Sequence, residues 1–346
     1  MKNYRQLCIC MLLSALGLFA LAQPRPHFVF NPTNPDVHDP VMAREDGKYY
    51  IFATGFRLAS MSSSDLKTWE QGKPLMEEAP AWAIDSVPGY KGHTWAPDIS
   101  FHNGLWHLYY SCSTFGKNTS AIGLMTNNTL NPESPDYKWV DQGVVVKSTP
   151  GITDWNAIDP NLIIDQAGTP WLTWGSFWDG IQLVQLAPDF KTPVGEPTTI
   201  ARRYAEGSKT KNVSEQNAEL AGNAPDAGFN SIEAPFMIYH DGYYYLFVSW
   251  DYCCRGPKSN YKTLVGRSKD VAGPFVDRTG KALTEGGGTI VAEGDDNYYG
   301  VGHSSAYDID GQWYFLAHGY SVADKGASKL VLRKMSFDNE GWPVLD

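Results

Sequence analysis

The sequence predicts an all-β protein, a five-bladed β-propeller, because one pattern recurs five times at a regular interval. In each copy a short turn containing glycine is followed by an alternating strand rich in aromatic residues. The copies begin between 57 and 74 residues apart, which is too long for a solenoid repeat and suits a four-stranded blade with its loops. The five copies occupy residues 46–55, 103–111, 167–175, 241–249 and 310–318.

A second short element precedes each turn, and it carries polar side chains. Because the same place in each repeat occupies the same place in each blade, these five stretches should surround one axis. We expect Asp39, Asp98, Asp159 and Glu233 to hold matching positions there, with His303 in the fifth blade. The stretches are 38–42, 96–100, 158–162, 233–237 and 302–306.

The rest of the chain fits one domain, residues 23–346. Strand signals dominate, Asp-Gly, Asn-Gly and Gly-Gly turns interrupt them, and no stretch has a convincing helical period. Residues 204–229 form a long polar interval before Glu233. They are expected to be a surface insertion that either shapes the rim of the axial site or has no role.

Residues 1–22 resemble a signal peptide. Lys2 and Arg5 precede an apolar run over 7–21 that ends in Ala20-Leu21-Ala22. The run is too short for a membrane span, so the mature protein is expected to be exported to the periplasm or beyond the cell, without membrane insertion.

Composition excludes some partners and one class of scaffold. The chain has 38 acidic and 28 basic residues and no basic patch, which disfavours nucleic acid and anionic membranes as partners. The mature chain has three cysteines, too few for a disulfide scaffold. The adjacent Cys253 and Cys254 could form a vicinal disulfide, but two buried thiols are the favoured interpretation.

Four carboxylates that converge on one pocket suit glycoside hydrolysis. Mutual repulsion raises the pKa of one carboxyl while a hydrogen-bonded neighbour stays ionised, and this reaction needs such an acid and base. The alternative is that each Asp merely caps a turn. Glu233 argues against that alternative, because a turn cap does not favour the longer acid.

Aromatic and small polar side chains near these acids suit a sugar. Aromatic faces can pack on sugar rings, while small groups bond hydroxyls, although most of the aromatics must pack between blades. His303 could bind a metal, bond a carboxylate or simply be a buried, satisfied histidine. The chain contains no zinc pattern, phosphate loop or nucleophile elbow. The predicted substrate-binding residues are Trp95, Asp98, Phe115, Gly116, Asn156, Ser176, Phe177 and Trp178.

These motifs together resemble the endo-1,5-α-L-arabinanases of glycoside hydrolase family 43. Single elements such as Asp-Pro are weak, but the ordered set, which includes Cys-Cys-Arg-Gly, is specific and covers nearly the whole mature chain. The matching stretches are 37–41, 93–98, 155–161, 175–178, 231–235, 251–256, 265–268 and 302–304.

The resemblance implies a five-bladed propeller and an inverting hydrolase that cleaves α-1,5-linked arabinofuranose chains in arabinan. Asp39 matches the general base, Glu233 the general acid, and Asp159 the carboxylate that orients the acid and adjusts its pKa. His303 matches a histidine beside an axial metal, usually calcium, that is held largely through waters. Asn156, Ser176, Phe177, Trp178 and Gly116 match stretches that line the substrate.

Two other functions remain open from the sequence. An exo-acting α-L-arabinofuranosidase or β-xylosidase could use the same fold and acids, since blade loops change specificity. A sugar-binding propeller without catalysis is a different class, and it would need no base, acid and modulator from three blades.

Overall fold

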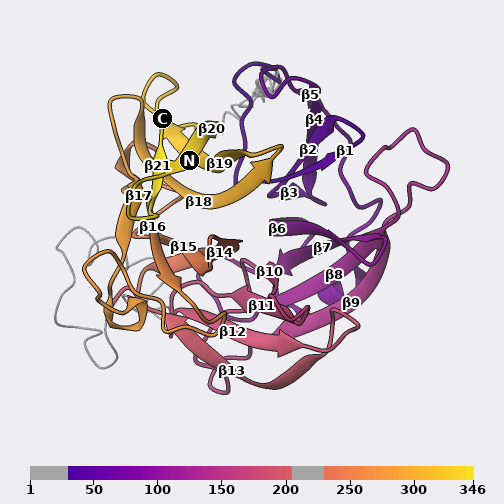
Figure 1. The fold of residues 1–346 in the computed structure, drawn as a ribbon. Helices are drawn as coiled ribbons and strands as arrows, with labels where there is room; N and C mark the ends of the chain where they lie inside the picture. Colours follow the sequence, from indigo (N-terminus) through magenta and orange to yellow (C-terminus); the bar gives the residue numbers. More distant parts are fainter. Residues whose placement is uncertain (1–29, 205–229) are drawn as a thin grey trace, which may run out of the picture. The chain divides into compact units, whose positions relative to one another are not determined.

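The computed structural model describes residues 30–204 and 230–346, and residues Asn31–Asp346 form one compact unit. Five antiparallel sheets follow one another around a ring in chain order (Figure 1). The predicted five-bladed β-propeller is therefore confirmed. The signal peptide predicted over 1–22 and most of the interval at 204–229 lie outside the described residues.

Each sheet is one blade, built mainly from consecutive strands. The first contains β1 (Val41–Glu45), β2 (Lys48–Ala53), β4 (Ala59–Ser63) and β5 (Glu70–Gln71). The second contains β6 (His93–His102), β7 (Leu105–Cys112), β8 (Ala121–Asn127) and β9 (Val140–Lys147), with β3 (Gly55–Phe56) added beside β6. The third contains β10 (Asn161–Ile164), β11 (Pro170–Trp174), β12 (Ile181–Leu186) and β13 (Pro193–Ala201).

The last two blades have four strands each. The fourth contains β14 (Ile232–His240), β15 (Tyr243–Trp250), β16 (Lys262–Ser268) and β17 (Thr289–Ala292). The fifth contains β18 (Tyr298–Ile309), β19 (Gln312–Ser321), β20 (Ser328–Phe337) and β21 (Pro343–Leu345).

The repeated sequence pattern is the hairpin between the first two strands of each blade. In the first hairpin Asp46 and Gly47 have φ values of 48° and 79°, and Asn103 and Gly104 repeat this geometry at 52° and 80°. Positive φ at both central residues matches the twist of the strands, which explains why Asp-Gly and Asn-Gly were such strong signals.

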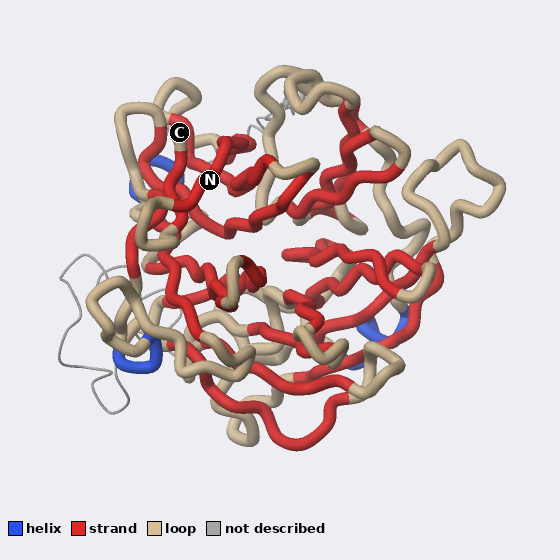
Figure 2. The backbone as a smooth tube through the Cα atoms, in the orientation of Figure 1, coloured by secondary structure: helices blue, strands red, loops and turns tan. Residues whose placement is uncertain are grey.

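Helices are few among the described residues, as the sequence predicted. They are the short α1 (Ala81–Ser86) and two 3-10 turns, Gly256–Lys258 and Leu283–Glu285, and strands and loops make up the rest (Figure 2). Over residues 30–204 and 230–346, no helix is both long enough and apolar enough to cross a membrane.

The chain closes the ring where its first described residues meet the last blade. Asp36 forms a β-bridge with Lys329, and the Val37 N–H donates to the Ser328 carbonyl at 3.1 Å. Residues 35–37 therefore pair beside β20 immediately before Asp39, which connects the first blade to the fifth through backbone hydrogen bonds.

Aromatic side chains fill the space between blades. Tyr109 and Trp174 are fully buried in a cluster shared by the second and third blades, and the Tyr109 hydroxyl donates to the Phe190 carbonyl at 2.5 Å. Much of the aromatic content therefore packs the blades, as expected.

Candidate active site

One pocket contains nearly all of the predicted site residues. Asp39, Asp159, Glu233 and His303 line it, although their blades are far apart in the sequence. The predicted substrate-binding residues Trp95, Phe115, Gly116, Asn156, Ser176, Phe177 and Trp178 line it too. Other residues of its wall are His38, Thr54, Ser113, Thr114, Lys117, Ile158, Tyr252, Cys253, Cys254 and Arg255.

The equivalent residues of the five blades share a left-handed backbone conformation. Asp39, Ala96, Asp159, Ala234 and His303 have φ between 44° and 59°, in or just before the first strand of each blade. Three of the five carry titratable side chains. The prediction that Asp98 and Glu233 occupy this same position is wrong: Glu233 comes one residue before it and Asp98 two residues after it.

The backbone N–H of each equivalent residue is bound by a side chain of the preceding blade. The N–H of Ala96 donates to Thr54 Oγ1 at 2.8 Å, that of Asp159 to Ser111 Oγ at 3.0 Å, and that of His303 to Ser249 Oγ at 2.8 Å. The N–H of Asp39 donates to His318 Nδ1 at 3.1 Å. Each acceptor lies eight residues after the first residue of its repeat.

The third blade is an exception to this rule, and the exception determines where Asp159 lies. Its acceptor position is Gly175, which has no side chain. The N–H of Ala234 instead donates to Asp159 Oδ2 at 3.1 Å. Asp159 thus replaces the missing side chain and is held next to Glu233, the neighbour of Ala234 in sequence.

Asp39 is buried and receives several hydrogen bonds. Its Oδ1 lies 2.9 Å from His38 Nδ1 and 3.0 Å from His303 Nδ1, and its Oδ2 accepts from Thr54 Oγ1 at 2.5 Å. Burial acts to raise the pKa of Asp39, but His303 and His38 outweigh burial and hold this pKa well below its ordinary value. Three of about four lone-pair sites are used, which leaves one for the proton of a water molecule.

Asp159 has the opposite character. It is 6 % exposed, and burial together with the charges of Glu233 and Asp39 raises its pKa well above the ordinary value, although His303 acts in the other direction. Asp159 therefore tends to hold a proton at a pH where Asp39 is ionised.

Glu233 is held by two hydroxyl groups. Ser176 Oγ donates to its Oε2 at 2.7 Å, and the Tyr261 hydroxyl donates to its Oε1 at 2.7 Å. A β-bridge between Ser176 and Glu233 fixes the two backbones together. Because a serine hydroxyl can rotate to accept a hydrogen bond, Glu233 can be held in both its protonated and its ionised form.

His303 completes the charged cluster. Burial acts to lower its pKa, but Asp39, Asp159 and Glu233 outweigh burial and raise the pKa to about 9. Its Nδ1 faces Asp39, which leaves Nε2 as the nitrogen available to an ion or a substrate.

The wall of the pocket offers groups suited to a polar ligand with apolar faces. Asn156 is 4 % exposed, and its Oδ1 has no hydrogen-bond partner among the described residues, so it can accept a ligand hydroxyl. Trp95 donates its indole N–H to His93 Nδ1 at 2.8 Å, whereas Phe115 is 66 % exposed.

Asp98 does not line the pocket. Its Oδ1 accepts from Asn161 Nδ2 at 3.0 Å and its Oδ2 accepts from the Leu162 N–H at 2.8 Å, so it joins the second blade to the third. Burial raises the pKa of Asp98 to about 6. Asp98 lies two residues beyond the left-handed position, and its side chain points between the second and third blades. The predicted substrate contact is therefore wrong, and Asp98 has a structural role.

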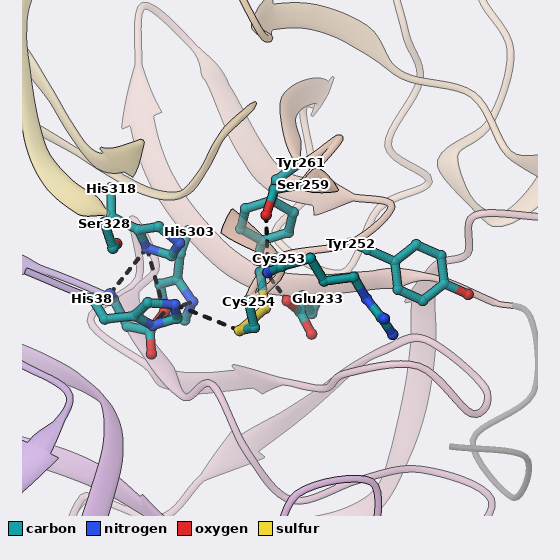
Figure 3. The surroundings of a disulfide bond; sticks show 12 residues. His38, Glu233, Tyr252, Cys253, Cys254, Ser259, Tyr261, His303, His318 and Ser328 are labelled. Atoms are coloured by element: carbon teal, nitrogen blue, oxygen red, sulfur yellow. Dashed lines mark hydrogen bonds and ion pairs between the residues drawn. A yellow bond between two sulfur atoms is a disulfide. The ribbon is translucent and has the colours of Figure 1, made fainter. Parts of the chain in front are cut away.

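The favoured interpretation of Cys253 and Cys254 as buried thiols is also wrong. The two residues form a vicinal disulfide at the pocket wall, where Cys254 is exposed and Cys253 half-buried (Figure 3). Cys254 has a φ of 64°, in the left-handed region of the backbone.

Several residues of the site were not predicted from the sequence. His38, Thr54, His318 and Tyr261 contact the acids directly, and Tyr320 bonds two of the histidines. A usable signal existed for Thr54 and His318, since both lie eight residues after the first residue of their repeat, where serine stands in two other blades. Nothing in the repeat marks Tyr261, which lies between β15 and β16.

The pocket thus combines an ionised carboxylate, Asp39, with a carboxyl group, Asp159, whose raised pKa favours its protonated form. Such a pair of environments provides a base and an acid in one site at the same pH. An ionised carboxylate can activate water while a protonated one serves a leaving oxygen.

Known proteins resemble this chain over most of its length. Residues 30–343 match the family model for glycosyl hydrolases family 43. A solved exo-1,5-α-L-arabinanase from a bovine ruminal metagenomic library is 66 % identical, with a TM-score of 0.84 over 92 % of this chain and 99 % of that one.

Two curated relatives come from bacteria. The extracellular exo-α-(1→5)-L-arabinofuranosidase of Cellvibrio japonicus is 44 % identical over 90 % of this chain and 86 % of its own length. The extracellular endo-α-(1→5)-L-arabinanase 1 of Bacillus subtilis is 37 % identical over 96 % of this chain and 94 % of its own. The match spans every blade, and the chain belongs to the glycosyl hydrolases of family 43.

Proposed function

We propose that this protein hydrolyses the α-1,5-L-arabinofuranosidic linkages of arabinan with inversion of the anomeric carbon. The observation that carries the proposal is the convergence of Asp39, Asp159 and Glu233 in one pocket, where Asp39 and Asp159 have opposite protonation tendencies. The substrate follows from the relatives, two named for exo action and one for endo action on α-1,5-linked arabinose.

Each acid has a separate task in this proposal. Asp39 is the general base that takes a proton from water, and Glu233 is the general acid that protonates the leaving oxygen. Asp159 accepts from the N–H of Ala234, next to Glu233, and so orients Glu233. Inversion requires room for water between base and acid, so the carboxyl groups of Asp39 and Glu233 should be roughly 6.5 to 9.5 Å apart in the substrate complex.

We propose exo action in place of the endo action expected from the sequence. The two relatives with 66 % and 44 % identity carry exo names, whereas the endo relative from Bacillus subtilis is 37 % identical. The same acids serve both modes, and loops at the rim of the pocket decide between them.

The test uses linear α-1,5-arabinohexaose and arabinan with the purified protein. Exo action releases one short product from the first minutes while the viscosity of arabinan falls slowly. A ladder of intermediate oligomers with a rapid fall in viscosity would establish endo action instead. Proton NMR of the first product should show the inverted anomer, and retention would overturn the mechanism.

Catalysis must also be separated from sugar binding alone. Asp39→Asn should bind arabinohexaose with little change in Kd and release no product, because the amide keeps the shape of the base but cannot take a proton. If the wild-type protein binds the oligomer without cleaving it, the protein is a sugar-binding propeller.

A calcium ion beside His303 is part of the proposal. His303 fits this role because Asp39 occupies Nδ1 and leaves Nε2 for the ion, the usual arrangement of a metal-binding histidine supported by a carboxylate. A single histidine with waters suits a hard ion, and a cation would offset the repulsion among the three acids. Export is proposed too, in line with the two relatives named extracellular.

A further inference from the structure

The fifth blade holds Asp39 with a histidine where three other blades use a hydroxyl. The backbone N–H of the left-handed residue needs only one acceptor, and Thr54, Ser111 and Ser249 supply it from their blades. His318 supplies the same acceptor through Nδ1, but its ring also has a second nitrogen on the far side. That second nitrogen, Nε2, makes a further hydrogen bond.

His318 Nε2 lies 3.1 Å from the Tyr320 hydroxyl. Because Nδ1 accepts from the Asp39 N–H, the proton of the neutral ring must be on Nε2, which therefore donates to Tyr320. Burial and the neighbouring His38 lower the pKa of His318 well below its ordinary value, in keeping with a neutral ring.

The Tyr320 oxygen also accepts from the backbone N–H of Cys254 at 2.6 Å. With both lone pairs used, the tyrosine hydroxyl proton faces His38 Nε2 at 3.0 Å and Cys254 Sγ at 3.9 Å, and the nearer imidazole nitrogen is the stronger acceptor. His38 Nε2 then acts as an acceptor, so its proton must be on Nδ1, which lies 2.9 Å from Asp39 Oδ1.

This series of hydrogen bonds ends at the Cys253–Cys254 disulfide on the pocket wall. The N–H that bonds Tyr320 belongs to the peptide between Cys253 and Cys254, which the disulfide encloses in a small covalent ring. The ring restricts rotation of this peptide, and Cys254 Sγ faces His38 Nε2 at 3.6 Å (Figure 3).

We propose that the Cys253–Cys254 disulfide, Tyr320, His318 and His38 form one positioning chain that keeps a donor hydrogen of His38 on the carboxylate of Asp39. The chain is a set of positioning residues and takes no part in bond breaking. This inference rests on the proposed function only in that Asp39 is the base. The arrangement of protons is a property of the protein without substrate.

Nitrogen-15 NMR of the histidine rings tests the proton positions directly. Wild-type protein should show His38 protonated on Nδ1 and His318 on Nε2. Tyr320→Phe keeps the ring but removes the hydroxyl, so His38 should shift toward the Nε2-protonated form. Tyr314→Phe, six residues earlier on β19, is the matched control and should leave both rings unchanged. An Nε2-protonated His38 in the wild type would overturn the proposal.

Kinetics distinguish positioning from a purely structural role. Tyr320 does not line the pocket, so Tyr320→Phe should lower kcat about 5- to 10-fold, the worth of one lost hydrogen bond, and leave KM unchanged. His38→Asn keeps a donor near the position of Nδ1 but cannot reach Tyr320. In this background Tyr320→Phe should have no further effect on kcat.

The disulfide is tested by reduction with a dithiol. The reagent is oxidised to its own disulfide, and Cys253 and Cys254 each gain a proton and an electron as the S–S bond breaks. Reduction should lower kcat in the wild type and have a clearly smaller effect in Tyr320→Phe, because that variant keeps only the direct contact of 3.6 Å between Cys254 Sγ and His38 Nε2. Equal losses of kcat on reduction in both proteins would overturn the role of the disulfide.

These outcomes are separable from failure of the proposed function. If Asp39→Asn kept full activity, Asp39 would not be the general base. The NMR experiment would still show which nitrogens of His38 and His318 carry the protons. If Asp39→Asn is inactive and Tyr320→Phe retains wild-type kcat, the positioning proposal alone is overturned.

Discussion

At the scale of single residues, Asp39 and Asp159 show how one pocket gives two aspartates opposite behaviour. Two histidine rings within 3.0 Å hold Asp39 ionised, whereas Asp159 has one backbone donor, Ala234, and two acidic neighbours. Burial is common to both, so the difference comes from hydrogen-bond donors and nearby charge.

The lowered pKa of Asp39 predicts the acid side of the pH profile. Because the base acts when ionised, kcat/KM should persist as pH falls and decline only below about 3.9, the ordinary value for aspartate. A pH series with arabinohexaose checks this in proteins that remain folded by circular dichroism. His38→Ala removes one donor and should move the decline to higher pH, and an unmoved decline would contradict the assignment.

At the scale of elements, the site depends on a missing side chain after β11. Gly175 has φ of 138°, and a Cβ there would lie 2.3 Å from the Gly180 carbonyl oxygen. Both the backbone conformation and the close approach require glycine, and the gap it leaves lets Asp159 reach the Ala234 N–H.

Gly175→Ala should therefore destabilise the protein and reduce activity together. Gly168→Ala is the control, since Gly168 has φ of 84° but a Cβ there meets nothing within 4 Å. The control should cost about 1 to 2 kcal/mol, the usual penalty for left-handed backbone, and leave kcat unchanged. Gly175→Ala should cost clearly more in urea unfolding. Equal costs would show that the contact with Gly180 is unimportant.

At the scale of the whole molecule, the ring brings His303 of the last blade against Asp39 of the first. In the metal-free protein the pKa of His303 is about 9, above its ordinary 6.5. Its protonated form thus contributes stability that is fully present below pH 6.5 and is lost as pH rises through 9. A calcium ion on Nε2 would have to displace this proton.

Calcium affinity should consequently rise between pH 6.5 and 9, and calcium should flatten the loss of stability over the same range. Isothermal titration calorimetry and thermal unfolding of chelator-treated protein measure the two effects. His303→Gln should weaken calcium binding and abolish its pH dependence. Full activity and an unchanged Tm after exhaustive chelation would remove calcium from the proposal.

The sequence by itself determined the number of blades and most of the pocket. Turn chemistry is local, so a glycine-containing turn indicates its hairpin without knowledge of the fold. Four Asp-Gly or Asn-Gly pairs and one Ala-Gly pair, each followed by an aromatic strand, imply five blades. Equivalent places in a repeat meet at one axis, so the repeat alone predicts that Asp39, Asp159 and His303 lie close together.

Only the tertiary structure decided the direction in which the side chains point and which of them bond across blades. A shift of two residues turns Asp98 from the pocket into the gap between blades, and the repeat pattern does not resolve such a shift near a bulge. The contacts of His38 with Tyr320 and Cys254 span 282 and 216 residues. Such pairs are created by closure of the ring, and no local pattern records them.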